Sequence, residues 1–136
     1  MKALLLLLPV LLATCTPGLL PEGKHVVIRS DSYWEFNDLE KVEPSPDWQR
    51  WHSEVEECLD LEADFREIHW YTSTEMYTPA KLKLSGLHWN REGASMIILA
   101  EQDKNTVKHE VAHFVLHAHA VKRHHWNGEF WRCINA

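Results

Sequence analysis

The amino-acid sequence predicts one small α+β domain. Two segments have the apolar spacing of a helix, one after Ser45 and one after Lys104, and three β-rich segments lie between them. Of the 136 residues, 45% are hydrophobic and 25% are charged, as expected of one folded unit with a real core. We therefore expect an N-terminal helix packed on a three- or four-stranded, mostly antiparallel sheet, followed by a second helix and a short C-terminal segment.

The first residues are typical of an export signal. Lys2 precedes an apolar run over residues 3–13, which suits a signal peptide and is too short to cross a bilayer. Leu-Ala-Thr-Cys at residues 12–15 resembles the lipobox of bacterial lipoproteins, in which the cysteine is lipidated. We expect residues 1–15 to direct export to the bacterial cell envelope, with membrane attachment through a lipid on Cys15. A secreted protein that is cleaved slightly later is the alternative.

The predicted domain covers residues 25–136. The preceding segment, residues 16–24, holds two prolines and two glycines without periodicity, which is typical of a tether. A β-branched run at residues 25–29 is expected as an edge strand, and residues 30–43 as an acidic loop.

The element boundaries follow from local signals. Ser45 is expected to cap the first helix, Pro46 suits its first position, and apolar spacings of three and four extend the helix to about Leu61. The segments between this helix and the second one predict an antiparallel sheet. Its strands are expected at residues 65–72, 84–90 and 95–100, with a hairpin turn at residues 90–93.

Cys58 and Cys133 remain as a pair if Cys15 carries the lipid. In an oxidising compartment a disulfide is the simplest state of two such cysteines. That bond would tie the first helix to the last segment of the chain. Two unpaired, buried thiols are the alternative.

The second helix carries the pattern His-Glu-Val-Ala-His at residues 109–113. On a helix, His109 and His113 lie one turn apart on the same face, so both can reach one ion at the ~2.0–2.1 Å that zinc prefers. Glu110 is rotated by about 100° from His109, which keeps it off the metal but lets it reach a water molecule. We expect a Zn²⁺ site with Glu110 as the general base.

A third metal ligand is expected after a chain reversal near residues 120–124, because residues farther along the same helix climb away from the ion. His125 is the favoured ligand, and His124 and the acidic Glu129 are the alternatives. A group that stabilises the oxyanion is also needed, and the sequence does not choose between its candidates. These are Tyr71, His88, His119 and Arg123.

The segment from Lys108 to Cys133 resembles the zincin metallopeptidases, most of all the SprT-like and WLM-like groups. In those groups a helix with two histidines is followed by a third histidine shortly before an aromatic residue, as in His-His-Trp-Asn-Gly-Glu-Phe-Trp at residues 124–131. This match covers about a fifth of the chain. The resemblance implies a zincin-like domain in which the strand before the active-site helix, residues 95–101, lies along the cleft and hydrogen-bonds an extended peptide.

We therefore expect zinc-dependent hydrolysis of peptide bonds in a protein or peptide substrate, outside the cytoplasm. One alternative is a catalytically silent, zinc-stabilised binding module on the bacterial envelope, which has no need of the Glu110 carboxylate. Another is a metal carrier, suggested by the ten histidines, although a carrier needs several loose ligands and no general base. The net charge of -6 and the scattered basic residues argue against a nucleic-acid partner. Substrate specificity and oligomeric state do not follow from the sequence.

Overall fold

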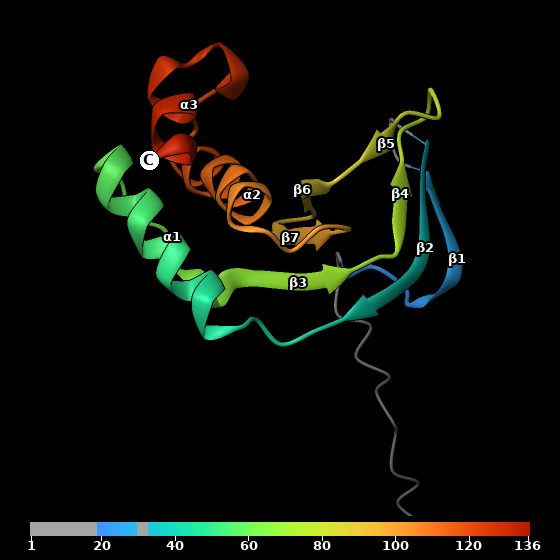
Figure 1. Cartoon of the computed structure of the whole chain (residues 1–136). Coiled ribbons are helices and arrows are strands. Elements are labelled where there is room, and N and C mark those ends of the chain that lie inside the picture. The colour runs from blue at the N-terminus through green and yellow to red at the C-terminus, as the bar shows by residue number, and fades with distance from the viewer. Residues whose placement is uncertain (1–18, 30–32) are drawn as a thin grey trace, which may run out of the picture.

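The structure, a computed structural model, describes residues 19–29 and 33–136 (Figure 1). The strands are β1 (Gly23–Arg29), β2 (Tyr33–Lys41), β3 (Ile68–Thr72), β4 (Glu75–Tyr77), β5 (Lys83–Leu84), β6 (Gly86–Arg91) and β7 (Ala94–Leu99). The helices are α1 (Pro46–Leu59), α2 (Lys104–Ala118) and α3 (Gly128–Asn135), with short 3-10 helices η1 (Phe65–Glu67) and η2 (His124–Trp126). The predicted α+β class is confirmed.

The expected export signal, including Cys15, lies outside the described residues. Leu20, in the segment expected as a tether, is buried, and its backbone N–H donates to the Tyr71 hydroxyl at 3.3 Å. Since β1 begins at Gly23, ordered structure extends to residues before His25. In the described ranges, no helix has the length and apolar character that a membrane span needs.

The sheet is larger than expected and mixed. Among the described residues it has seven strands in the order β5-β4-β2-β3-β7-β6, with β1 added on β2. All described pairs are antiparallel except β3 with β7, which run parallel from the Ile68–Ser95 pair to the Thr72–Leu99 pair. The expectation of a mostly antiparallel sheet is confirmed, and β1 is the edge strand expected at residues 25–29. The expected number of three or four strands was too low, because β2, β4 and the short β5 join the strands that the sequence predicts.

β2 forms where the sequence predicts an acidic loop. Phe36 and Leu39 are its buried apolar residues, and they are three positions apart, although side chains on one face of a flat strand repeat every two. Between them, Asp38 has a φ of 52°, in the left-handed region, which turns the strand. This kink breaks the period-two alternation by which a strand is found in a sequence.

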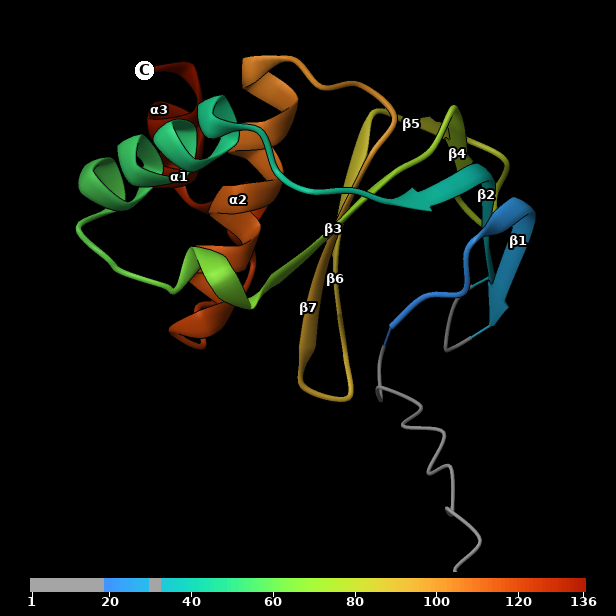
Figure 2. The ribbon, with the colours of Figure 1, turned by 90° about the horizontal axis from the view of Figure 1, so that it is seen from below.

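The three helices cover one face of the central strands, and β1, β2, β4 and β5 lie on the other side, as the two views agree (Figures 1 and 2). β7 separates two hydrophobic clusters. Ile97 and Leu99 pack with the helices, whereas Met96 and Ile98 pack with the cluster around Phe36. The continuous apolar run of β7 is thus buried on both faces.

The local signals at helix and turn boundaries are confirmed. Ser45 caps α1 by accepting from the Trp48 backbone N–H, and the helix ends at Leu59 because Asp60 takes a left-handed conformation. β6 and β7 are joined by Glu92 and Gly93, with φ of 51° and 82°. Two consecutive residues with positive φ form the tight turn that suits the twist of a hairpin.

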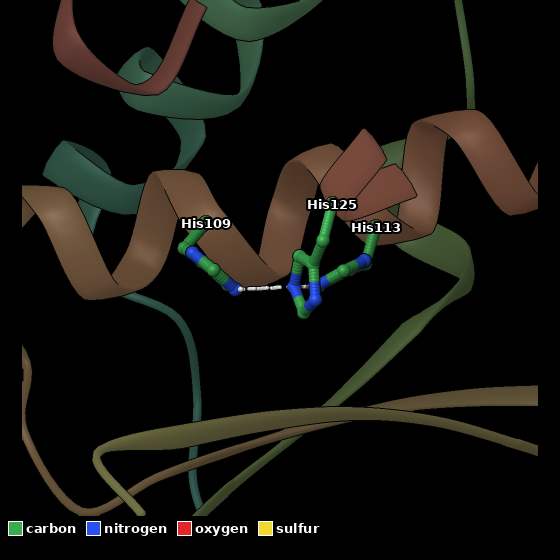
Figure 3. A group of neighbouring side chains, drawn as sticks. All are labelled: His109, His113 and His125. Carbon is green, nitrogen blue, oxygen red and sulfur yellow. Dashed lines mark hydrogen bonds between the residues drawn. The ribbon is translucent and has the colours of Figure 1, made fainter. Parts of the chain in front are cut away.

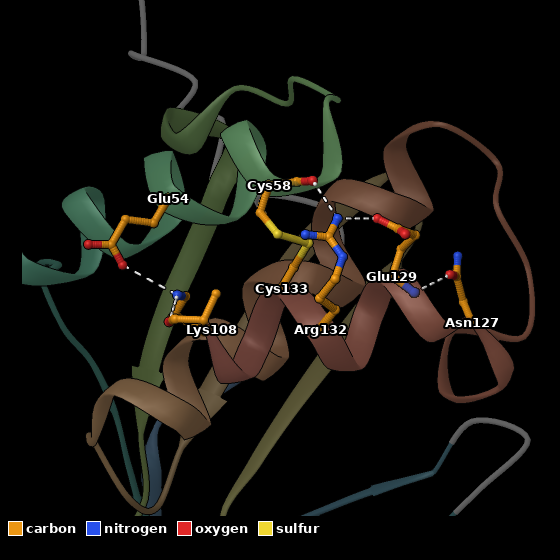
Figure 4. Close-up of a disulfide and its surroundings, with 8 residues drawn as sticks. Glu54, Cys58, Lys108, Asn127, Glu129, Arg132 and Cys133 are labelled. Carbon is orange, nitrogen blue, oxygen red and sulfur yellow. Dashed lines mark hydrogen bonds and ion pairs between the residues drawn. A yellow bond between two sulfur atoms is a disulfide. The ribbon is translucent and has the colours of Figure 1, made fainter.

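The predicted disulfide between Cys58 and Cys133 is present and joins α1 to α3 (Figure 4). Cys133 is fully buried, and the Arg132 guanidinium donates to the Cys58 carbonyl at 3.4 Å beside the bond. The bond closes a loop of 75 residues that contains α2 and most of the sheet. In the chain-entropy description, a loop of that length contributes about 4 kcal/mol by restricting the unfolded chain.

Replacing both cysteines, Cys58→Ala with Cys133→Ala, is expected to lower the free energy of unfolding by about 2 to 5 kcal/mol. Denaturant unfolding with and without a reductant measures the loss. Once reduced, the wild type should unfold near the same denaturant concentration as the variant. An oxidised wild type no more stable than the variant would contradict this account.

Candidate metal centre

α2 positions the first two histidines of the candidate site. Asp103 caps the helix by accepting from the Thr106 backbone N–H at 3.1 Å, and Val107 and Val111 are fully buried in the core against the sheet. The cap and the buried face fix the rotation of the helix. His109 and His113 lie on a neighbouring, half-buried face of the same helix.

His125 completes a group of three imidazoles whose Nε2 atoms converge (Figure 3). The Nε2 of His113 lies 3.2 Å from that of His109 and 3.0 Å from that of His125, and the third side of the triangle measures 3.3 Å. Nitrogen atoms bound tetrahedrally at about 2.0–2.1 Å from one ion lie roughly 3.3–3.4 Å apart. The three side chains therefore form a group that could hold one metal ion.

The predicted chain reversal brings His125 to this group. After α2 ends, Ala120 and Arg123 both take left-handed conformations with φ of 56°. Between them, the Val121 backbone N–H donates to the Leu116 carbonyl at 3.0 Å, which holds the turn against the end of α2. The chain then runs back as η2, and His125 faces the two histidines of the helix (Figure 3).

Neither alternative third ligand belongs to the group. His124 turns to the outer side of His113, with the two Nδ1 atoms 2.8 Å apart. Glu129 is exposed, and its carboxylate pairs with Arg132 in the first turn of α3 (Figure 4). One nitrogen of the Arg132 guanidinium thus contacts the Glu129 carboxylate, which lies outside the group of three histidines.

α3 supplies an aromatic wall behind the histidines. The Phe130 ring is fully buried, with its centroid 5.0 Å from that of His109 and 4.8 Å from that of His113. The Trp131 indole N–H donates to the His125 carbonyl at 2.9 Å. These two residues hold the imidazoles in place, and their only sign in the sequence is an aromatic pair close after the third histidine.

Glu110 lies against the start of β6, where Gly86 leaves room for its side chain. A Cβ atom on Gly86 would lie 2.9 Å from the Glu110 Cγ and 2.9 Å from the Thr106 Cγ2, closer than such atoms approach. Burial raises the pKa of the Glu110 carboxyl to about 8, partly offset by a hydrogen bond from the His88 backbone. The side chain is therefore a buried carboxyl that holds its proton up to about pH 8, and it lines the same cavity as His109.

Burial favours the neutral form of His109 and His113. Burial, followed by the nearby His125, lowers the pKa of His109 to about 4. Burial and the neighbouring imidazoles lower the pKa of His113 to about 3. Because a metal ion binds the unprotonated ring nitrogen, these shifts favour metal binding at neutral pH.

Two cavities flank the histidine group. One, of about 390 Å³, lies between the start of β6 and helices α2 and α3, and His109, Glu110 and Trp131 line it. The other, of about 240 Å³, is lined by residues of η2 together with His113. His109 thus lines one cavity, and His113 and His125 line the other.

The strand nearest this cleft is β6, which corrects the expectation that residues 95–101 line it. β7 pairs with β3 on one side and with β6 on the other, so its backbone groups are already used. β6 ends the strand order within the described part of the chain, and Gly86 at its start lines the larger cavity. From the sequence order, the strand directly before the helix was expected to line the cleft. The hairpin of β6 and β7 instead places the earlier strand, β6, at the edge of the sheet.

The four residues that the sequence offers for stabilising the oxyanion lie at different distances from the histidine group. Tyr71 is buried in the cluster on the far face of the sheet. The His119 Nε2 is bonded to the Glu62 carbonyl at 2.6 Å. Arg123 lines the smaller cavity, and His88 packs beside α2 with a buried Nε2 that has no hydrogen-bond partner in the described residues. His88 and Arg123 are thus the two that lie near the group.

Comparison with protein-family models finds no match for this chain, and comparisons with curated proteins and with solved structures find none either. Its function is therefore inferred from the residues and their geometry.

Gly86→Ala is expected to destabilise the protein by about 1–3 kcal/mol, because the added methyl group meets the buried Glu110 and Thr106. The matched control is Gly128→Ala, where a Cβ atom meets nothing within 4 Å. Urea unfolding of both variants measures the difference. Equal stability of the two variants would show that the close approach of β6 to α2 is not a constraint.

The pKa of Glu110 is raised to about 8 from an ordinary 4.5, which predicts that this carboxyl lowers the stability of the fold in a pH-dependent way. Between these values the unfolded chain releases the proton that the folded chain keeps, so stability falls as pH rises through that interval. Glu110→Gln does not titrate. For metal-free protein, the unfolding free energy of wild type relative to Glu110→Gln should decline across the interval and level off above it. If the unfolding free energies of the two proteins changed with pH in the same way, the raised pKa of Glu110 would be contradicted.

Proposed function

We propose that the protein is a zinc-dependent hydrolase that cleaves peptide bonds in protein or peptide substrates. The observation that carries this proposal is the convergence of His125 on the pair His109 and His113, with the three Nε2 atoms 3.0 to 3.3 Å apart. Glu110 adjoins this group on the same helix and lines the same cavity as His109.

The donor set fits a catalytic zinc ion. Imidazole suits zinc and its transition-metal neighbours, whereas calcium and magnesium prefer oxygen ligands. Structural zinc sites have four protein ligands, and catalytic sites have three and leave one position open. In the described residues, no fourth histidine, cysteine or carboxylate joins the group of His109, His113 and His125. This count favours a catalytic ion over a purely structural one.

When bound, a zinc ion supplies Lewis acidity that polarises a carbonyl group and makes water more acidic. The other steps fall to side chains of the protein. Glu110 accepts a proton from water at a carboxylate oxygen and returns it to the departing amine nitrogen. Burial of Glu110 beside the cavity suits this shuttle, because a carboxyl with a raised pKa holds and releases a proton near neutral pH. His88 and Arg123 are the nearby candidates to stabilise negative charge on the substrate oxygen.

A silent binding module accounts less well for Glu110. The carboxyl is only 6% exposed and its pKa is raised by burial, which makes it costly for folding at neutral pH. A binding module without catalytic activity would be more stable with an apolar residue in place of Glu110. A metal carrier is also disfavoured, because the described residues contain one group of three ligands rather than several loose ones.

We further propose that the protein acts outside the cytoplasm, with residues 1–15 as the export signal and Cys15 as the lipid attachment site. The Cys58–Cys133 bond supports an oxidising compartment, since disulfides rarely persist in the cytosol. The bacterial cell envelope, or secretion, agrees with this bond.

Glu110→Gln is expected to retain one bound zinc and to lose about 10²–10⁴-fold in cleavage of an unfolded protein, because the proton acceptor is removed and the ligands remain. Conversion of any one of the three histidines to alanine should lose the zinc as well. Elemental analysis and a proteolysis assay measure the two effects. His25→Ala, on β1 and outside the group, is the control and should keep both.

A wild-type protein that binds one zinc and cleaves no protein or peptide would leave the binding module as the better account. A protein that binds no zinc would contradict both.

A further inference from the structure

We propose that His124 is a positioning residue that holds His113 in the tautomer required for metal binding. The inference builds on the proposed zinc site. It starts from two contacts of the His124 ring: its Nδ1 lies 2.8 Å from the His113 Nδ1, and its Nε2 lies 2.6 Å from the Val121 carbonyl oxygen. The ring therefore bridges a candidate metal ligand and the backbone.

The direction of these hydrogen bonds follows from the chemistry of the groups. A carbonyl oxygen only accepts, so the His124 Nε2 must carry the hydrogen that it donates to Val121. A neutral imidazole has one N–H, and the His124 Nδ1 is therefore an acceptor. The His113 Nδ1 must then be the donor. This leaves the lone pair of the His113 Nε2 free, at the atom that faces His109 and His125.

The bridge is anchored to the helix that it serves. The Val121 backbone N–H donates to the Leu116 carbonyl at 3.0 Å near the end of α2, and the Val121 side chain packs against the core. The His124 ring is half-buried, with its centroid 5.0 Å from that of His113, and it stacks on Phe130 at 6.4 Å. A chain of hydrogen bonds thus leaves α2 at Leu116 and returns to it at His113.

The 3-10 geometry of η2 explains why the adjacent residues His124 and His125 make different contacts. Successive residues of such a helix are rotated by about 120°, so neighbouring side chains point to different sides. His125 faces the gap between the helix ligands, and His124 reaches the outer nitrogen of His113. Metal-bound histidines commonly donate their second N–H to a fixed acceptor, and removal of that acceptor costs about 10–100-fold in metal affinity.

His113 is the ligand that such a contact can control. The Nδ1 atoms of His109 and His125 make no hydrogen bond to any described residue, whereas that of His113 has His124. Removal of the His124 ring should therefore act on the zinc site through His113.

The test uses the full domain with zinc alone as the probe. His124→Leu keeps bulk but removes the acceptor, and it should weaken zinc binding about 10–100-fold in competition with a chromogenic chelator. His124→Asn places an amide oxygen near the position of Nδ1 and should retain most of the affinity. His119→Leu is the matched control, because His119 also contacts a backbone carbonyl, at 2.6 Å, but lies outside the group.

A second readout does not depend on any variant. Nitrogen NMR of metal-free wild type at neutral pH should find the hydrogen of His113 on Nδ1 and that of His124 on Nε2. In folded His124→Leu, the His113 hydrogen should be distributed between both nitrogens. His113 protonated at Nε2 in the wild type, or a His124→Leu variant that binds zinc as tightly as wild type, would overturn the proposal. Both readouts are independent of peptide cleavage, so an inactive wild type would contradict the proposed function and leave this inference standing.

Discussion

The burial of α2 against the central strands is the constraint on which the candidate site depends. Val107, Val111 and Val115 have no exposed surface, so the helix cannot rotate without exposing them. The same rotation aims His109 and His113 at the cleft and Glu110 at β6. A further side of the helix carries the buried Lys108, whose ammonium group lies 3.3 Å from the Glu54 carboxylate and 2.9 Å from the Ala136 oxygen (Figure 4). Each side of α2 is thus held by a different part of the fold.

Much of the site can be predicted from local sequence patterns. The cap at Ser45 and the hairpin turn before β7 depend on a few neighbouring residues, and the spacing of His109 and His113 is set by the helix alone. His125 could be expected as the third member because residues farther along α2 climb away from the ion, whereas a reversal after the helix can bring another donor back to it. The pairing of Cys58 with Cys133 follows from the small number of cysteines once Cys15 is set aside.

The rest depends on contacts between distant residues. The parallel pairing of β3 with β7 leaves no local pattern, and β2 is hidden by the turn at Asp38. The packing of Phe130 on the imidazoles and the fit of Glu110 against Gly86 arise only when separate segments meet. The sequence suggests His124 only as a ligand, because its position next to His125 does not reveal that the two rings face different sides.

The candidate site is also where this small fold tolerates unfavourable burial. The pKa of His88 is lowered to about 4, first by burial, while the pKa of Glu110 moves in the opposite direction. The charged forms of these groups are disfavoured by burial, which lowers the stability that the core supplies. Local conflicts of this kind are expected where a protein binds or reacts.

The covalent ring closed by Cys58 and Cys133 also bears on resistance to protease damage. The connection between β4 and β5 is exposed from Pro79 to Lys83 and lies inside this ring. A single cut there yields two pieces that remain linked through sulfur. All three imidazoles, together with Glu110 and His124, stay on the C-terminal piece, so a nicked molecule in a protease-rich environment keeps every side chain of its centre on one polypeptide.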